Sequence, residues 1–207
     1  MAHLIKRKQL YSTYPDIPFI KYNPFTDEEF VAIPGGVSRL ILGTNALKLQ
    51  AHKSILYKEM KRFFVGIGAT EFVIFGASDT PWLFREKSYT DSRSKRIMES
   101  FRKSGIKPQF NGAVKVELKA LWPWLRDVSR CVSVNALVQE MYFMDINEKL
   151  FFSPCKHENI HVSFLTQSVS DRFMNFLPTS ELRILELKNC GAEIYNKPAI
   201  AGRKLLI

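Results

Sequence analysis

Three residues have the chemistry of a metal-dependent nuclease. Glu117 and Lys119 spell an E-x-K pattern, in which the carboxylate can hold a cation while the lysine stabilises the attacking water. Asp79 is the candidate second carboxylate. The same spelling recurs at residues 59–61 and 186–188, so the spacing alone does not single out one copy. A nuclease with these three catalytic candidates is one hypothesis.

A second group of side chains has ligands for a metal ion. Cys155, His157 and His161 follow a Cys-x-His-x-x-x-His spacing, which can hold zinc if both histidines share one helix face. However, His161 begins a run that predicts a strand, and no second cysteine lies near in sequence. We therefore expect a surface loop here and no metal, with these residues as the only metal candidates.

A loop with polar and aromatic side chains follows the apolar run at residues 72–75. It contains Ser78, Asp79 and Trp82. Ligand sites in α/β sheets tend to form just beyond the carboxyl end of a central strand, and this loop has that position. It is the candidate pocket. The alternative is that Ser78 and Asp79 form a turn before Pro81 while Trp82 packs into the core.

Positive charge is concentrated in the middle of the chain. The 207 residues carry a formal charge of +10, and positions 61–130 hold 14 basic residues against 7 acidic ones. This charge predicts an acidic partner, either nucleic acid or an acidic protein. The alternative is an ordinary solvated surface. The candidate binding residues are Lys53, Lys58, Arg62, Arg93, Lys95, Arg96, Arg102 and Lys103.

Two predicted helices must position these basic residues. Apolar residues recur at helical spacing within residues 50–65, which predicts a helix that buries one side and turns its lysines outward. Gly66 ends it. A second helix is predicted over residues 93–104, where Asp91 or Ser92 can cap the first turn.

Short apolar runs predict the sheet on which these helices pack. Residues 137–152 fit either a helix or a hairpin of two aromatic strands, and we favour the hairpin. Residues 171–177 and 180–189 predict helical pieces on either side of Pro178. The other predicted strands are residues 37–42, 72–75, 113–118, 160–165, 192–195 and 204–207.

These elements predict an α/β (or α+β) fold, with a mixed central sheet and helices packed on it. Residues 1–36 are expected to form an irregular arm because prolines and glycines interrupt them, with a helix-starting capping box at Thr26. A basic α/β unit at residues 37–119 and a near-neutral one at 120–207 are expected to pack as one globular body.

A weak internal echo is compatible with two similar strand-helix-strand units. A shift of 90 residues lays residues 71–75 over 161–165, and a slightly smaller shift lays RIMES over RILEL.

The cysteines and the lengths of the apolar runs indicate the cellular compartment in which the protein is expected. Cys131, Cys155 and Cys190 are widely spaced and odd in number, which argues against a disulfide framework and for a reducing compartment. The N-terminal residues contain no signal-peptide-like apolar run, and no segment reaches the roughly 18 to 20 apolar residues of a membrane span. We therefore expect a soluble, cytoplasmic protein.

The order of the predicted elements resembles the later half of the N-acyltransferase (GNAT-like) superfamily, which includes the acyl-homoserine-lactone synthases. The chain departs from that family where its glycine-rich pyrophosphate loop should follow the first strand, because GTNALKLQ contains a single glycine, Gly43. The resemblance implies an acyltransferase-like enzyme and carries over no catalytic residue. It covers VSRLIL, the helix at residues 50–65, EFVIF, the helix at residues 93–104 and GIKPQFNGAVKVEL.

Three functions therefore stand as hypotheses, and the residues indicate no cofactor. The first is a non-enzymatic accessory protein that binds nucleic acid or an acidic partner through a basic surface from residues 50–107. An acyltransferase-like enzyme and a metal-dependent nuclease are the alternatives. A single binding surface requires the basic residues of both helices to face the same side.

Overall fold

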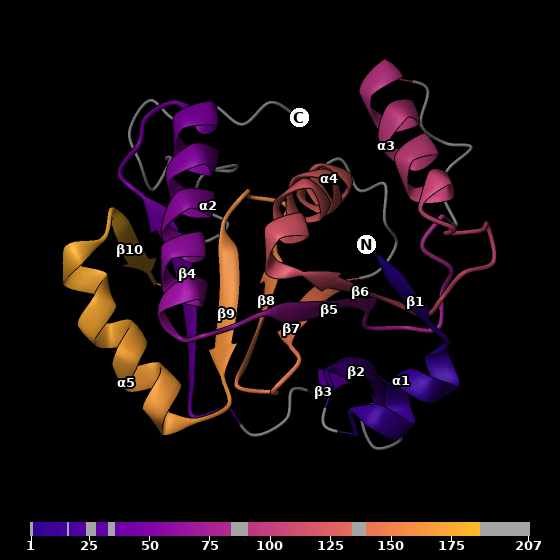
Figure 1. The fold of residues 1–207 in the computed structure, drawn as a ribbon, viewed down its shortest axis with the longest axis horizontal. Helices are drawn as coiled ribbons and strands as arrows, with labels where there is room; N and C mark the ends of the chain where they lie inside the picture. The colour runs from indigo at the N-terminus through magenta and orange to yellow at the C-terminus, as the bar shows by residue number, and fades with distance from the viewer. Residues whose placement is uncertain are drawn as a thin grey trace.

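The computed structural model describes residues 2–15, 17–23, 28–32, 36–83, 91–133 and 140–186. An eight-stranded sheet forms its centre (Figure 1). In spatial order the strands are β1 (His3–Ile5), β6 (Ala113–Glu117), β5 (Glu71–Gly76), β7 (Met141–Asp145), β8 (Leu150–Pro154), β9 (Ile160–Phe164), β4 (Ser38–Thr44) and β10 (Leu182–Leu185).

Every neighbouring pair in this sheet is antiparallel. The predicted α/β class is confirmed, with helices packed on a central sheet, but the sheet is not mixed. β4 and β5 are joined through a helix, as a parallel pair would be, yet they do not pair. The meander β7–β8–β9 lies between them. The ligand-site rule for parallel strands therefore does not apply to the loop after β5.

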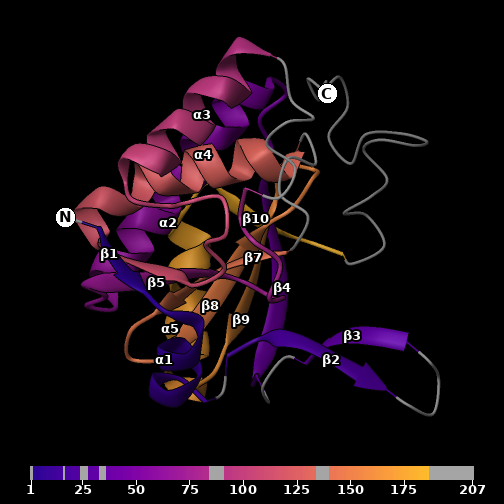
Figure 2. The ribbon, with the colours of Figure 1, turned by 90° about the vertical axis from the view of Figure 1, so that its right-hand side faces the viewer.

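Helices cover the two faces of the sheet (Figure 2). One face carries α2 (Leu49–Gly66), α3 (Ser92–Lys103), α4 (Leu121–Ser133) and α5 (Gln167–Phe176), with short 3-10 turns at Leu118–Ala120 and Leu177–Thr179. The other face carries α1 (Arg7–Thr13). The hairpin of β2 (Phe19–Asn23) and β3 (Glu28–Ala32) extends away from the sheet in Figure 2.

The side chains of β5 confirm that this strand is covered on both faces. Phe72 and Ile74 belong to the core beneath α2, α3 and α4, whereas Val73 and Phe75 pack with Leu10 of α1. Such alternation places successive side chains on opposite faces of a strand. An apolar run without polar interruption is therefore what a strand in this position requires.

Both predicted basic helices are confirmed within a few residues of their expected bounds. In α3 the Asp91 side chain accepts a hydrogen bond of 2.9 Å from the Ser94 amide, as a helix cap does. These hydrogen bonds from Ser94 lower the pKa of Asp91 below its usual value. The hairpin favoured for residues 137–152 is also confirmed, as β7 and β8.

The predicted irregular arm is wrong for its described part. β1 pairs with β6, and α1 buries Leu10 against the sheet, so residues close to the N-terminus belong to the core. Glu28–Ala32 forms a strand and not the start of a helix, because it pairs with β2. Thr26 itself lies outside the described residues.

Two further elements differ from the predictions. The piece expected to be helical after Pro178 is β10 in its described part, where Leu182 and Leu185 are buried and the backbone pairs with β4. Helix α4 (Leu121–Ser133) was not predicted. Pro123 lies in the first turn of α4, where its missing N–H breaks no hydrogen bond. The last two predicted strands lie outside the described residues.

The predicted units at residues 37–119 and 120–207 share one sheet, because β4 lies between β9 and β10. The internal echo matches elements in one of its two parts, because residues 71–75 and most of 161–165 lie in the strands β5 and β9. RIMES lies in the helix α3, whereas the described part of RILEL belongs to the strand β10 and its end. In the described part of the chain, no helix has both the length and the apolar composition that crossing a membrane demands.

Candidate functional site

The candidate pocket after β5 is closed by its own side chains. Trp82 is 0% exposed, and its indole Nε1 donates a 3.1 Å hydrogen bond to the Gly112 carbonyl. The Ser78 hydroxyl accepts a hydrogen bond from the Thr80 amide, as in a turn. The alternative stated for this loop, a turn followed by a core tryptophan, therefore describes it better than a ligand site.

Asp79 is bound by the N-terminal helix. The Arg7 Nε lies 2.9 Å from Asp79 Oδ1, and its Nη1 donates a 2.7 Å hydrogen bond to the Gly76 carbonyl. The same guanidinium stacks over the Tyr11 ring at 4.7 Å. Burial raises the pKa of Tyr11, and the nearby Arg7 opposes this shift. Arg7 therefore fastens α1 to the loop after β5.

The nuclease candidates do not converge. Glu117 is paired with Glu71 at the first residue of β5, whereas Asp79 follows the last residue of that strand, Gly76. Five strand steps separate the two ends by about 16 Å. Glu117 instead pairs with Lys119 at 2.7 Å, which lowers the pKa of the carboxyl. The predicted site with two carboxylates is wrong.

The metal candidates lie around the turn between β8 and β9. His161 belongs to β9, and His157 is buried in the turn, so the expected surface loop is wrong at this point. The turn packs on α2, whose buried His52 contacts the Glu158 carbonyl through Nε2 at 3.0 Å. Within the described ranges, no three His, Cys, Asp or Glu side chains are grouped so that they could hold a metal ion.

The basic residues of α2 are occupied by carboxylates of the same chain. Lys53 Nζ lies 2.7 Å from Glu158 Oε1, and Lys58 lies 3.0 Å from Glu181. Arg62 pairs with Glu59, which is fully buried, and stacks over the Phe176 ring. Each of these three basic side chains is therefore paired with a carboxylate of the same chain, and Lys53 is also largely buried.

Helix α4 separates α2 from α3 (Figure 1). Its Trp122 stacks on Phe64 of α2 at 6.2 Å, and its Trp124 stacks on Phe101 of α3 at 5.5 Å. Both tryptophans therefore pack elements together. The hypothesis of one basic surface made by α2 and α3 is wrong, because the two helices lie on opposite sides of α4.

The basic residues of α3 remain open to solvent. Arg93, Lys95 and Arg96 are exposed and form no ion pair with any other residue that the structure describes. Arg102 and Lys103 lie 3.7 Å from the exposed Glu99, a distance typical of a loose surface pair. Among the predicted binding residues, α3 therefore supplies those that are exposed and not paired with a described carboxylate.

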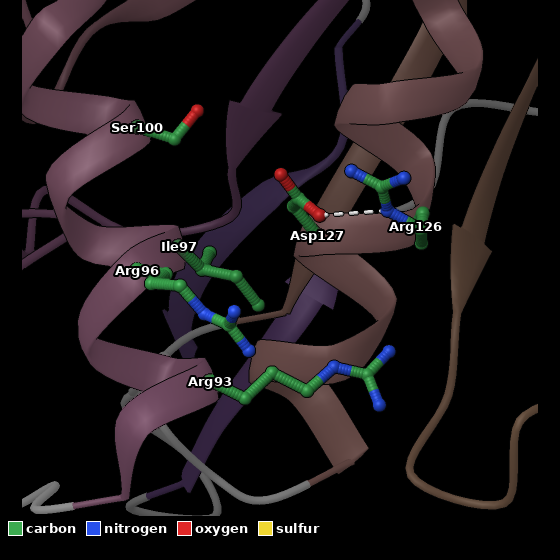
Figure 3. A pocket seen from close by; sticks show the side chains of 6 residues that line it. All are labelled: Arg93, Arg96, Ile97, Ser100, Arg126 and Asp127. Carbon is green, nitrogen blue, oxygen red and sulfur yellow. Dashed lines mark hydrogen bonds and ion pairs between the residues drawn. The ribbon is translucent and has the colours of Figure 1, made fainter.

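A pocket of about 360 Å³ opens between α3 and α4 (Figure 3). We call it the α3–α4 groove. It holds three guanidinium groups and one carboxylate. Its lining residues are Arg93, Arg96, Ile97 and Ser100 of α3 and Arg126 and Asp127 of α4.

Two lining residues of the α3–α4 groove, Arg126 and Asp127, were missed by sequence reasoning because α4 was not predicted. The apolar spacing of Leu121, Leu125 and Val128, all buried, is the pattern that could have found this helix. The same spacing places Arg126 off the buried side. The Arg126 Nε donates a 3.0 Å hydrogen bond to Asp127 Oδ1.

No protein-family model, curated protein sequence or solved structure matches this chain. The resemblance to N-acyltransferases therefore stays a prediction. What the chain can do has to be inferred from the residues of the α3–α4 groove and of the exposed face of α3.

Proposed function

We propose that this protein binds nucleic acid by contacting phosphate groups with the α3–α4 groove and the exposed face of α3. The observation that carries the proposal is the exposure of Arg93 and Arg96 at the edge of the groove, without an ion pair to other described residues. Basic side chains that replace counterions along a phosphate backbone gain affinity that falls as salt rises.

The type and spacing of the basic residues favour phosphate as the ligand. All three cations that line the groove are arginines, and the planar guanidinium donates two parallel hydrogen bonds to a phosphate. From Arg93 to Lys103 the helix axis rises by about 15 Å, which is long enough to meet several consecutive phosphates. A polymer of phosphates can contact more of these basic side chains at once than a single small anion can.

An acidic protein is the other partner that the charge predicts. Its carboxylates are spread over an irregular surface, whereas the phosphates of nucleic acid repeat at a regular spacing. A cytoplasmic location belongs to this proposal too. It accords with Cys131 and Cys155, neither of which forms a disulfide in the described part of the structure.

The test is a comparison of two double variants that remove the same charge. Arg93→Gln with Arg96→Gln removes two cations at the groove, and Lys61→Gln with Lys156→Gln removes two exposed cations elsewhere. We expect the first variant to weaken binding of a labelled oligonucleotide at least about tenfold, since each charged hydrogen bond contributes roughly 1.5 kcal/mol or more. The second variant should change affinity much less.

Fluorescence anisotropy at moderate salt, with single-stranded and duplex RNA and DNA, measures these affinities. Equal weakening by both double variants would show that only net charge matters and would contradict the assignment to α3. If the protein bound polyglutamate more tightly than every oligonucleotide, the result would contradict nucleic-acid binding and favour an acidic protein as the partner of this surface.

A further inference from the structure

The α3–α4 groove contains one side chain that does not suit a phosphate. Asp127 lines the groove together with three arginines, and its side chain is only 15% exposed. A carboxylate at this position repels an approaching phosphate, and its low exposure limits how far solvent screens that repulsion. An explanation is needed for an anion in a groove that otherwise attracts anions.

One carboxylate oxygen of Asp127 is engaged and the other points elsewhere. Oδ1 accepts the 3.0 Å hydrogen bond from the Arg126 Nε. Figure 3 shows the second oxygen directed away from Arg126, on the side of the carboxylate that faces α3. A carboxylate oxygen is a hydrogen-bond acceptor only, so a ligand meets it favourably by donating a proton.

The two nucleic-acid backbones differ in this respect. The deoxyribose-phosphate backbone of DNA carries acceptors and no hydrogen-bond donor. Each ribose of RNA adds a 2′-hydroxyl, which can donate, close to the phosphates that the arginines would hold. RNA can therefore satisfy Asp127 and the three arginines together, whereas the DNA backbone offers the second carboxylate oxygen no hydrogen-bond donor and brings a phosphate close to it.

We infer that the α3–α4 groove selects RNA over DNA, with Asp127 accepting a hydrogen bond from a ribose 2′-hydroxyl. This inference rests on the proposed function. It assigns Arg93, Arg96 and Arg126 to the phosphates and Asp127 to the sugar. The arginines supply affinity for either backbone, and the aspartate supplies the difference between them.

The experiment compares three single-stranded oligomers that carry the same uracil bases on ribose, 2′-deoxyribose or 2′-O-methylribose. Each oligomer should be longer than a typical single-strand binding site, which covers about 4 to 16 nucleotides. We expect wild-type protein to bind the ribose oligomer about tenfold more tightly than either other oligomer, as one charge-assisted hydrogen bond predicts. The methylated oligomer keeps the RNA sugar pucker but loses the donor and gains a methyl group, whereas the deoxyribose oligomer loses the whole hydroxyl and adds no bulk.

Two variants locate the effect. Asp127→Ala should reduce the preference for ribose to about one and raise affinity for the deoxyribose oligomer, because the repulsion is gone. Glu99→Gln is the matched control, since Glu99 is an exposed carboxylate of α3 that does not line the groove. It should raise affinity for all three oligomers equally. If Asp127→Ala fails to fold, Asp127→Asn replaces it and should lower the preference for ribose.

The possible failures are distinguishable. Equal wild-type affinity for the three sugars, or a preference that the Asp127 variants retain, overturns the role of Asp127 and leaves phosphate binding standing. Failure to bind any oligomer overturns the proposed function, and this inference with it.

Discussion

Lys53 Nζ lies 2.7 Å from Glu158 Oε1, and both side chains are largely buried where α2 meets the turn between β8 and β9. Lys53 was among the residues expected to bind an acidic partner. Its partner is a carboxylate of the same chain, 3% exposed. Lys53 of α2 therefore contributes to the stability of the fold, whereas Arg93 and Arg96 of α3 form no ion pair with other described residues.

Replacing Lys53 should destabilise the protein strongly. Lys53→Met leaves the Glu158 carboxylate buried without its cation, which costs about 3 kcal/mol of unfolding free energy. Lys61→Met, an exposed position on the same helix, should change it by about 0.5 kcal/mol or less. Urea unfolding measures both. Similar small effects at the two positions would show that the pair contributes little.

Arg7 should be the residue that holds α1 to the sheet. Arg7→Met removes the hydrogen bonds to Gly76 and Asp79 and should lower the unfolding free energy by about 2 kcal/mol. Lys8→Met, at the exposed neighbour, is the control. Asp79→Asn should matter less than Arg7→Met, because the Asp79 side chain is 74% exposed. A larger loss from Asp79→Asn would contradict this order.

Asp145 should make stability depend on pH. Burial raises its pKa above the ordinary value of 3.8, while Lys149 and hydrogen bonds oppose the shift. The folded state therefore holds this proton more tightly than the unfolded state does, so the carboxylate costs stability as the pH rises through the raised pKa. The Oδ2 atom is buried without a hydrogen-bond partner.

Asp145→Asn removes that cost. The variant should be more stable than the wild type at neutral pH, and its advantage should disappear as the pH falls below 3.8, where Asp145 is protonated in both states. Chemical unfolding across this pH range gives the comparison. An advantage that stays constant down to acid pH would rule out titration of Asp145 as its cause.

Local patterns sufficed to predict three elements of the fold, of which α3 carries part of the proposed binding surface. The apolar stripe of α2, the Asp91 cap of α3 and the unbroken apolar run of β5 are contained within short stretches of sequence. Each of these signals reports on neighbouring residues, and the structure confirms all three elements.

Contacts between positions far apart in the chain could not be predicted from the sequence. Arg7 and Asp79 are 72 positions apart, and neither residue type indicates its partner. The antiparallel order of the sheet depends on the meander β7–β8–β9 lying between β4 and β5, which no local spacing encodes. The groove was missed for a similar reason, since it requires α3 and α4 to be placed side by side.

The salt dependence of RNA binding tests the central claim most directly. The logarithm of the association constant should fall linearly with the logarithm of salt concentration, with a slope of about −0.7 per single-strand phosphate contacted and about −2 for the three arginines of the groove. Arg93→Gln with Arg96→Gln should make the slope less negative by about 1.4, the share of two phosphate contacts. Lys61→Gln with Lys156→Gln should leave it unchanged. Two results would contradict the claim: binding that does not weaken as salt rises, or the same slope in the wild type and in the Arg93→Gln, Arg96→Gln variant.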